Sequence, residues 1–256
     1  MRKQMLAGNW KMNGSISTLE NYFSVFRECL GVPISQVLEK VDLCFAVPFT
    51  LLAKAKEVVG DSKIQIAAQN CHFEEKGAYT GEISLNMLGE LSIDASLVAH
   101  SERRQYYNET DSSASKKVKS LLNKGFSPIL CVGETQAERE KGKTNQVLET
   151  QLSAVYEGLA DINSLVIAYE PVWAIGTGLA ATPELANEAH QFIRSYTKEK
   201  FGEMTAAELR ILYGGSMKPD NVDSLLSMEH IDGGLVGGAS LKPADFASMV
   251  GSALRV

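Results

Sequence analysis

Apolar residues gather along the chain in eight short runs rich in Val, Ile, Leu and Ala. Most runs are apolar at successive positions rather than at alternate ones, which is typical of strands buried on both faces of a parallel sheet. We therefore predict eight strands, within QMLAG around Met5, VDLCFAV from Val41, KIQIAAQN from Lys63, DASLVAH from Asp94, FSPILCVGE from Phe126, SLVIAYE from Ser164, LRILYGG from Leu209 and DGGLVGGA from Asp232.

Between these runs, apolar residues recur with the spacing of helices. The segments 17–30 and 145–159 each place five apolar side chains on one stripe, which predicts amphipathic helices. In a third segment, Thr182 is placed to cap a helix that has Pro183 at its first position. We expect that helix to end at Gly202.

Strand and helix alternate over residues 1–256 without a long linker rich in Pro or Ser, which predicts a single α/β domain. Eight strand–helix units fit a closed (β/α)8 barrel, which usually takes about 250 residues. The alternative is a doubly wound open sheet, which is disfavoured because no GxGxxG motif follows the first strand.

Composition and charge argue against nucleic acid and membranes as binding partners. The net charge of −6 gives no positive surface of the kind that binds nucleic acid or an anionic membrane. No apolar run approaches the roughly 18 residues that cross a membrane, and the N-terminus lacks the apolar segment of a signal peptide. Cys29, Cys44, Cys71 and Cys131 show no paired-ligand spacing, so we expect reduced thiols in a cytoplasmic protein.

Polar residues follow several of the predicted strands at their carboxyl ends, where barrels gather their active groups. Asn9 and Lys11 follow the first strand, His100 and Glu102 the fourth, and Glu170 the sixth. Because the carboxyl ends of all strands open on one face of a barrel, this pattern predicts a shared site.

Two glycine-rich turns follow the last two strands. YGGS ends at Ser216, and Gly237 and Gly238 follow the eighth strand. Adjacent N–H groups in such turns form concavities that bind anions, and phosphate sites recur at this place in barrels. The alternative is two tight turns without a ligand.

Three titratable side chains are candidates for chemistry. Glu170 ends an apolar run, so we expect partial desolvation to raise its pKa and make it a better base; otherwise it is an ion-pair partner or solvated. His100 precedes SERR, where Ser101 can cap a helix with Glu102 in its first turn, and the positive helix end would keep the imidazole neutral. Alternatively His100 is a buried structural histidine, and Lys11 is either a fixed cation or a solvated surface charge.

The other histidines, His72, His190 and His230, stand apart from the strand ends and are interpreted as structural or surface residues. No two histidines have the spacing of metal ligands, so we expect no metal site.

Six motifs, in order and over the whole chain, resemble those of the triosephosphate isomerase family. They are GNWKMN, AQNCHFEEKGAYTGEIS, HSERR, AYEPVWAIGTG, YGGS and GLVGGASLK. The resemblance implies a homodimeric enzyme of glycolysis and gluconeogenesis. It would interconvert dihydroxyacetone phosphate and D-glyceraldehyde 3-phosphate through an enediolate, without a cofactor or a metal.

The resemblance also implies roles for single residues. Glu170 would be the catalytic base, and neutral His100 the electrophile that polarises the carbonyl group. Lys11 would stabilise the negative charge of the enediolate, Glu102 would hold Lys11 in position, and Asn9 would help to hold the substrate.

The same resemblance implies that Gly176, Ser216, Gly237 and Gly238 bind the phosphate group, largely through backbone N–H groups. AYEPVWAIGTG would combine the base with a lid over the site. The segment EEKGAYTGE would be an interface loop whose Thr80 reaches into the site of a second subunit.

One residue departs from the family pattern, because Ala99 precedes His100 where the family usually has Gly. Alanine cannot cheaply adopt the backbone regions that glycine allows, so we expect Ala99 to shift His100 slightly or to mark a subgroup of the family.

Two other functions remain open. Another phosphate-binding barrel, such as an isomerase or lyase of biosynthesis, would share the glycine turns but not the full AYEPVWAIGTG stretch. A barrel that binds a phosphorylated metabolite or a protein without catalysis would show the loss of a catalytic residue.

Overall fold

The structure is a computed structural model that describes residues 2–174 and 181–256. Eight parallel strands close into a barrel in chain order, and β1 pairs with β8. The strands are β1 (Gln4–Asn9), β2 (Val41–Ala46), β3 (Gln65–Ala68), β4 (Ala95–Val98), β5 (Ser127–Val132), β6 (Val166–Tyr169), β7 (Arg210–Tyr213) and β8 (Gly233–Val236). The predicted (β/α)8 barrel is therefore confirmed, and the open doubly wound sheet is excluded.

The interior of the barrel is packed with side chains from alternate strand positions. Met5 and Ala7 of β1 belong to the inner cluster, while Leu6 between them packs outward with the helices. The inner cluster consists of Met5, Ala7, Cys44, Ala46, Ala67, Ala95, Leu97, Ile129, Cys131, Val166, Ala168, Leu212 and Leu235. Because the interior is a packed core, a ligand site must lie in the loops at the strand ends.

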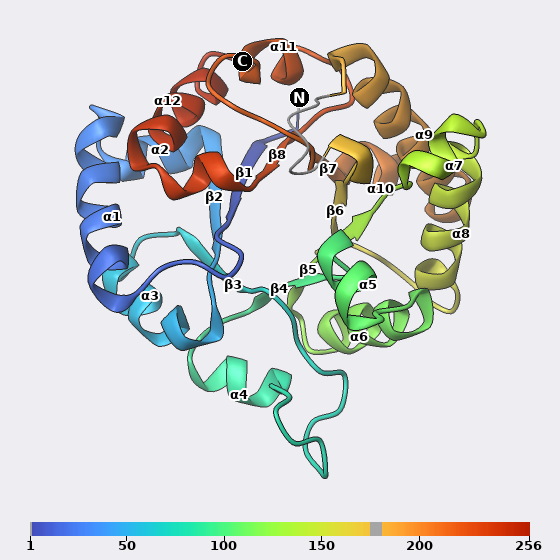
Figure 1. Ribbon diagram of the computed structural model, residues 1–256, viewed down its shortest axis with the longest axis horizontal. Helices are drawn as coiled ribbons and strands as arrows, with labels where there is room; N and C mark the ends of the chain where they lie inside the picture. Colours follow the sequence, from blue (N-terminus) through green and yellow to red (C-terminus); the bar gives the residue numbers. More distant parts are fainter. Residues whose placement is uncertain (1, 175–180) are drawn as a thin grey trace.

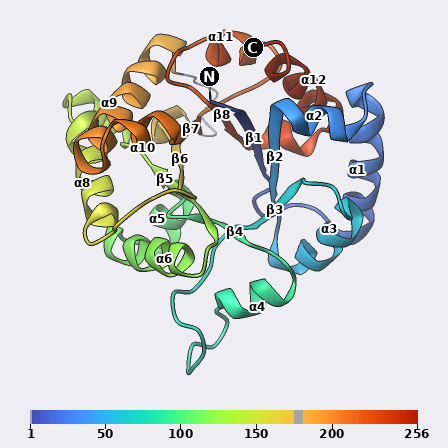
Figure 2. The ribbon, with the colours of Figure 1, turned by 180° about the vertical axis from the view of Figure 1, so that it is seen from behind.

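Helices surround the barrel on all sides, as opposite views show (Figures 1 and 2). They are α1 (Ile16–Leu30), α2 (Ile34–Lys40), α3 (Leu52–Val59), α4 (Leu85–Glu90), α5 (Ser101–Tyr107), α6 (Asp111–Asn123), α7 (Gln136–Glu140), α8 (Thr144–Tyr156), α9 (Pro183–Phe201), α10 (Glu203–Glu208), α11 (Val222–Leu226) and α12 (Pro243–Ala253). Short 3-10 helices are η1 (Phe49–Leu51), η2 (Val172–Ala174) and η3 (Gly238–Leu241). Among the helices described, none is both long and apolar enough to cross a membrane.

Helix α9 begins and ends at its predicted residues. The side chain of Thr182 accepts a hydrogen bond from the backbone N–H of Leu185, and Pro183 takes the first helical position. At the other end Gly202 has a φ of +88°, a conformation that favours glycine and stops the helix.

Helix α1 shows how the outer layer is held. Its predicted stripe is buried at Leu19, Tyr22, Phe23 and Phe26. The ring of Phe23 lies 4.9 Å from that of Phe45 in an edge-to-face arrangement. Since burying one large apolar side chain contributes about 1.5–3 kcal/mol, this outer core supplies much of the force that holds helices on the barrel.

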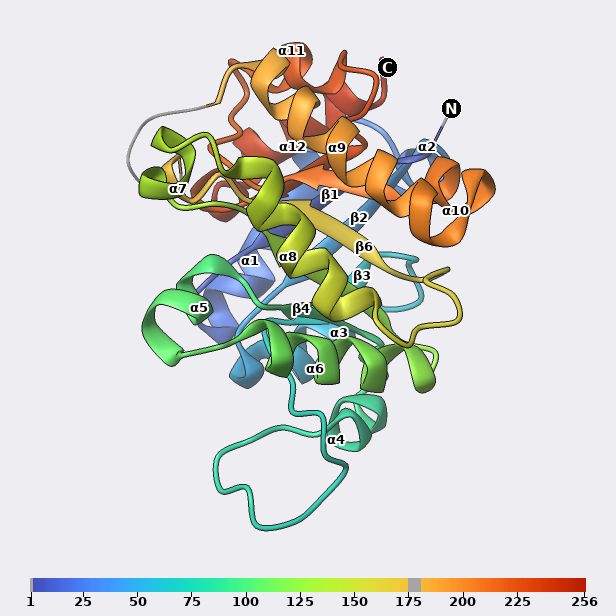
Figure 3. The ribbon, with the colours of Figure 1, turned by 90° about the vertical axis from the view of Figure 1, so that its right-hand side faces the viewer.

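The segment between β3 and α4 extends away from the barrel (Figure 3). Its base is closed by a hydrogen bond of 2.8 Å from the backbone N–H of His72 to the carbonyl of Ile83. Beyond that point Tyr79 is 44% exposed and Thr80 is also exposed.

Candidate active site

The polar residues and glycine turns that follow the strands line one pocket at the carboxyl end of the barrel. Its volume is about 290 Å³. Of the predicted site residues, the pocket is lined by Asn9, Lys11, His100, Glu170, Ser216, Gly237 and Gly238. The predicted phosphate ligand Gly176 lies outside the described residues.

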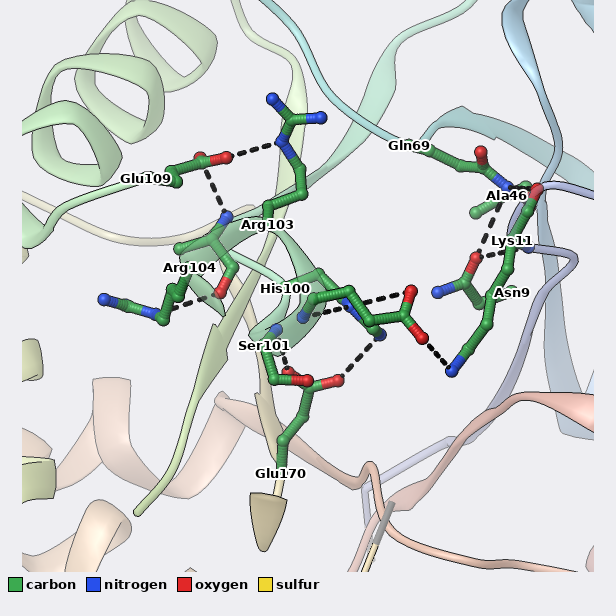
Figure 4. Close-up of polar contacts among 12 residues, drawn as sticks. Asn9, Lys11, Ala46, Gln69, His100, Ser101, Arg103, Arg104, Glu109 and Glu170 are labelled. Carbon is green, nitrogen blue, oxygen red and sulfur yellow. Dashed lines mark hydrogen bonds and ion pairs between the residues drawn. The ribbon is translucent and has the colours of Figure 1, made fainter. Parts of the chain in front are cut away.

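Glu170 comes directly after β6, and its side chain is only 2% exposed. Its Oε2 accepts a hydrogen bond of 2.8 Å from the backbone N–H of Ser101, and its Oε1 lies 2.9 Å from His100 Nε2 (Figure 4). Gly214 makes room for it, because a Cβ at that position would lie 2.8 Å from Glu170 Cγ and 3.0 Å from the carbonyl oxygen of Tyr169. The residue that follows β7 thus has to be glycine for the carboxylate of Glu170 to occupy its position.

His100 and Glu170 shift each other's pKa in opposite directions. Burial alone would raise the pKa of Glu170, but the imidazole of His100 and the N–H of Ser101 outweigh it and lower that pKa. Burial alone would lower the pKa of His100, but the carboxylate of Glu170 outweighs it and raises that pKa. The prediction of a raised pKa for Glu170 is therefore wrong for this arrangement, because the sequence indicated burial but not the two groups that face the carboxylate.

His100, not Ser101, caps helix α5. Its Nδ1 accepts a hydrogen bond of 3.2 Å from the backbone N–H of Glu102. Ser101 is already helical, and its own N–H is used by Glu170. Because Nδ1 is an acceptor, the ring proton belongs to Nε2, which faces Glu170. The helix end therefore favours the expected neutral imidazole, whereas the charge of Glu170 opposes it.

Lys11 follows β1 with its backbone in the left-handed region, at a φ of +52°. Its Nζ lies 2.5 Å from Glu102 Oε1, and its N–H donates to Asn9 Oδ1 at 3.0 Å. The amide of Gln69 closes the turn from the other side, since its Nε2 donates to the carbonyl of Lys11 at 2.9 Å and to that of Ala46 at 3.0 Å (Figure 4). These contacts fix the backbone of Lys11 and the position of its ammonium group.

The two glycine turns form the side of the pocket built by β7 and β8. Among the described residues, and leaving aside its chain neighbours and its own short helix, a Cβ added to Gly238 would meet no atom within 4 Å, and one added to Gly237 would lie 3.5 Å from Lys11 Cε. Packing against the described residues therefore does not demand glycine at either position. The carbonyl of Ser216 accepts from Asn221 Nδ2 at 3.0 Å, which fixes the β7 turn.

The remaining predicted residues lie elsewhere. Thr80 belongs to the extended segment after β3, and His190 is fully buried, which lowers its pKa to about 3. His72 stacks on Phe73 at 4.4 Å. Within residues 2–174 and 181–256, no three His, Cys, Asp or Glu side chains gather into a group that would hold a metal ion.

Several residues of the site were not among the predicted site residues. Met217, Lys218 and Leu235 line the pocket. Gln69 contacts Lys11, and Ser101, expected only as a helix cap, donates to Glu170. Gln69 lies in the third predicted run, directly after the last residue of β3, so the rule that placed the other polar residues at strand ends would also have found it.

Comparison with known proteins identifies relatives that match almost the full length. A sequence model described as triosephosphate isomerase matches residues 4–253. The triosephosphate isomerase of Chlorobium chlorochromatii is 46% identical over 253 residues, which is 99% of each chain. That of Clostridium beijerinckii is 47% identical over 252 residues, covering 98% of this chain and 99% of the relative. That of Geobacter metallireducens is 45% identical over 252 residues, covering 98% of both.

Proposed function

Since the chain belongs to the triosephosphate isomerase family and is an enzyme that interconverts triose phosphates in glycolysis, we propose that it does so by proton transfer through an enediolate, with Glu170 as the base. The observation that carries this proposal is the pair formed by Glu170 and His100. Carboxylate and imidazole lie 2.9 Å apart and line a pocket that also contains Lys11 and the glycine turns. One base, one proton donor and one fixed cation are the groups that an aldose–ketose isomerisation requires.

Glu170 takes a proton from the carbon next to the substrate carbonyl and returns it to the neighbouring carbon. The carboxyl group is ionised at neutral pH and can accept a proton, although its lowered pKa makes it a weaker base in the free enzyme than one whose pKa lies near the working pH. The N–H of Ser101 holds Oε2 in the free enzyme, so the carboxylate has to leave this donor to reach the substrate carbon.

His100 polarises the carbonyl group and shuttles protons between the two substrate oxygens. The hydrogen bond from Glu102 N–H to Nδ1 supports this role, since it keeps the proton on Nε2, the nitrogen on the side of Glu170. A neutral imidazole that donates a hydrogen bond from Nε2 stabilises the negative charge that develops on the substrate oxygen.

Lys11 stabilises the negative charge of the enediolate, and Asn9 helps to hold the substrate. The contacts of Lys11 support its role, since the carboxylate of Glu102 lies 2.5 Å from Lys11 Nζ and the Lys11 side chain is only 29% exposed. A charge held in a fixed place costs little reorganisation when the transition state forms.

The phosphate group binds to the turns after β7 and β8, at Ser216, Gly237 and Gly238, with Gly176 completing the site. Bare glycine backbone allows N–H groups to approach a phosphate oxygen closely. The volume of about 290 Å³ is large enough for a phosphorylated substrate of triose size.

We further propose a homodimer in which Thr80 of one subunit supports the site of the other. A hollow of about 210 Å³ adjoins the pocket and is lined by Lys11, Met12 and Tyr107, among others. Met12 is 95% exposed and Tyr107 is 65% exposed, as suits side chains that a second subunit covers. The extended segment that carries Thr80 is a suitable occupant of the same hollow in a partner.

A cytoplasmic location follows from the same proposal, since glycolysis runs in the cytoplasm. The four cysteines support it because all are free thiols, as in a reducing compartment.

A coupled assay with D-glyceraldehyde 3-phosphate tests the proposed function. We expect turnover by the purified protein and a large loss in Glu170→Asp. Turnover no greater than that of Glu170→Asp would overturn the proposal.

A further inference from the structure

The residue before His100 has an unusual backbone. Ala99 has a φ of +58°, in the left-handed region that residues with a Cβ occupy rarely and at a cost. Because Ala99 links β4 to the first residue of the site on that strand, its backbone angles set the direction in which His100 leaves the barrel. A relaxation of Ala99 to an ordinary negative φ would turn this peptide and carry the imidazole away from its present place.

Two side chains, those of Glu109 and Arg104 labelled in Figure 4, hold the peptide groups on either side of Ala99. Glu109 Oε1 accepts a hydrogen bond of 3.1 Å from the N–H of Ala99, and Arg104 Nε donates one of 3.0 Å to its carbonyl. The chain returns to Ala99 after the short helix α5, which ends at Asn108 in a left-handed conformation. One helix and its closing turn thus supply both contacts.

The carboxylate of Glu109 is itself fixed by its surroundings. Its side chain is 2% exposed, and Lys117 Nζ lies 2.9 Å from Oε1 while Arg103 Nε lies 2.6 Å from Oε2. Lys117 in turn donates to Asn70 Oδ1 at 2.7 Å. Burial alone would raise the pKa of Glu109, but these two cations outweigh it and lower the pKa, so the carboxylate stays ionised. A charged acceptor that cannot move is suited to hold a strained peptide.

We propose that Glu109 is a positioning residue of the active site, which holds Ala99 in its left-handed conformation and thereby aims His100 Nε2 into the pocket. The inference rests on the proposed role of His100 and extends it to a residue that lies outside the pocket. Glycine adopts a positive φ without penalty, so the need for Glu109 is tied to the alanine at position 99.

This link makes a double-mutant cycle decisive. We expect Glu109→Met, which removes the acceptor of the Ala99 N–H at similar side-chain length, to lower kcat about tenfold, the population ratio that corresponds to the usual penalty of a left-handed residue with a Cβ. KM for D-glyceraldehyde 3-phosphate stays within about twofold, because the glycine turns are unchanged. Ala99→Gly alone leaves kcat within about twofold, and added to Glu109→Met it restores most of the lost rate.

A second readout follows His100 directly. In protein labelled with ¹⁵N-histidine, Glu109→Met broadens or shifts the His100 imidazole signals, and Ala99→Gly restores them. Lys117→Met is a graded variant, because it keeps the acceptor of the Ala99 N–H but removes one of the two cations that fix this acceptor. It should lower the melting temperature and lower kcat by less than Glu109→Met does, since Arg103 still holds Oε2.

The outcomes separate this inference from the proposed function. Unchanged kcat and unchanged His100 signals in folded Glu109→Met would overturn it, and so would an equal loss of rate with and without Ala99→Gly. Should Glu109→Met not fold, Arg104→Met makes the same test from the carbonyl side of Ala99, because it removes the donor to that carbonyl. If the unaltered enzyme fails to isomerise triose phosphate, the proposed function is wrong, and the His100 signals still test the hold on Ala99.

Discussion

Shortening the proposed base by one methylene group probes the site most simply. In Glu170→Asp the carboxylate retreats by about 1.5 Å, the length of one carbon–carbon bond. Its present contacts, 2.8 Å to the N–H of Ser101 and 2.9 Å to His100 Nε2, would then lengthen past the hydrogen-bond limit of about 3.2 Å.

The size of the effect follows from that displacement. A misplacement of about 1 Å at the reacting centre costs about 10²-fold in rate, so we expect kcat to fall at least about 10²-fold. KM should change less than about threefold, because the glycine turns are not touched. Losing one buried methylene group and one hydrogen bond costs about 2 kcal/mol, which a domain with about 5–15 kcal/mol of stability tolerates.

The assay compares Glu170→Asp with Glu170→Gln, both checked for folding by circular dichroism. Glu170→Gln keeps the reach of the side chain but accepts no proton, so its kcat should lie below that of Glu170→Asp. Near-normal turnover in either folded variant would refute the assignment of Glu170 as the base.

Three further predictions rest on other parts of the site. Lys11→Ala should raise KM and lower kcat, each by about tenfold or more, because a charge-assisted hydrogen bond is worth about 1.5–3 kcal/mol. Stability should change by less than about 1 kcal/mol, since its partner Glu102 is 38% exposed; a variant with normal kinetics would contradict the role of Lys11. The pKa of Glu170 lies below 4.5, so its stabilising effect is complete above pH 4.5 and is lost as the pH falls through the lower folded value. Urea unfolding of the wild type and Glu170→Gln should therefore converge in acid, and a constant difference between about pH 3 and 6 would count against the lowered pKa. Shortening the loop around Thr80 should produce a monomer with reduced activity, and full activity in a monomer proven by sedimentation would exclude support from the partner.

The barrel could be predicted from the sequence because its strands are short, apolar and regularly spaced. Each of the eight predicted runs overlaps one observed strand, and only β1 extends past its run, by one residue to Asn9; Thr182, Pro183 and Gly202 mark the bounds of α9 as expected. These signals are local, since they depend only on the residues of one element and its ends.

The finer settings of the site could not be predicted because they depend on contacts between distant elements. The pKa of Glu170, which follows β6, is lowered by His100 and Ser101, which follow β4. These residues are distant in the sequence, and only the folded barrel brings them together. The cap of α5 is His100 because the helix begins at Ser101, the residue that the sequence offered as the cap. The sequence indicated that Ala99 stands where the family usually has glycine. The structure adds that Ala99 has a positive φ and that its N–H donates a hydrogen bond to Glu109.

The central claim is that the substrate proton passes through the carboxyl group of Glu170 by way of an enediolate. Isomerisation in deuterium oxide, followed by NMR of the product, tests this claim most directly. A carboxyl group exchanges its proton with solvent, so we predict deuterium at the carbon that receives the proton, and loss of turnover and incorporation together in Glu170→Gln. Full turnover with no deuterium in the product, together with unchanged turnover in Glu170→Gln, would contradict the account, because the hydrogen would then move between the two carbons without the carboxyl group.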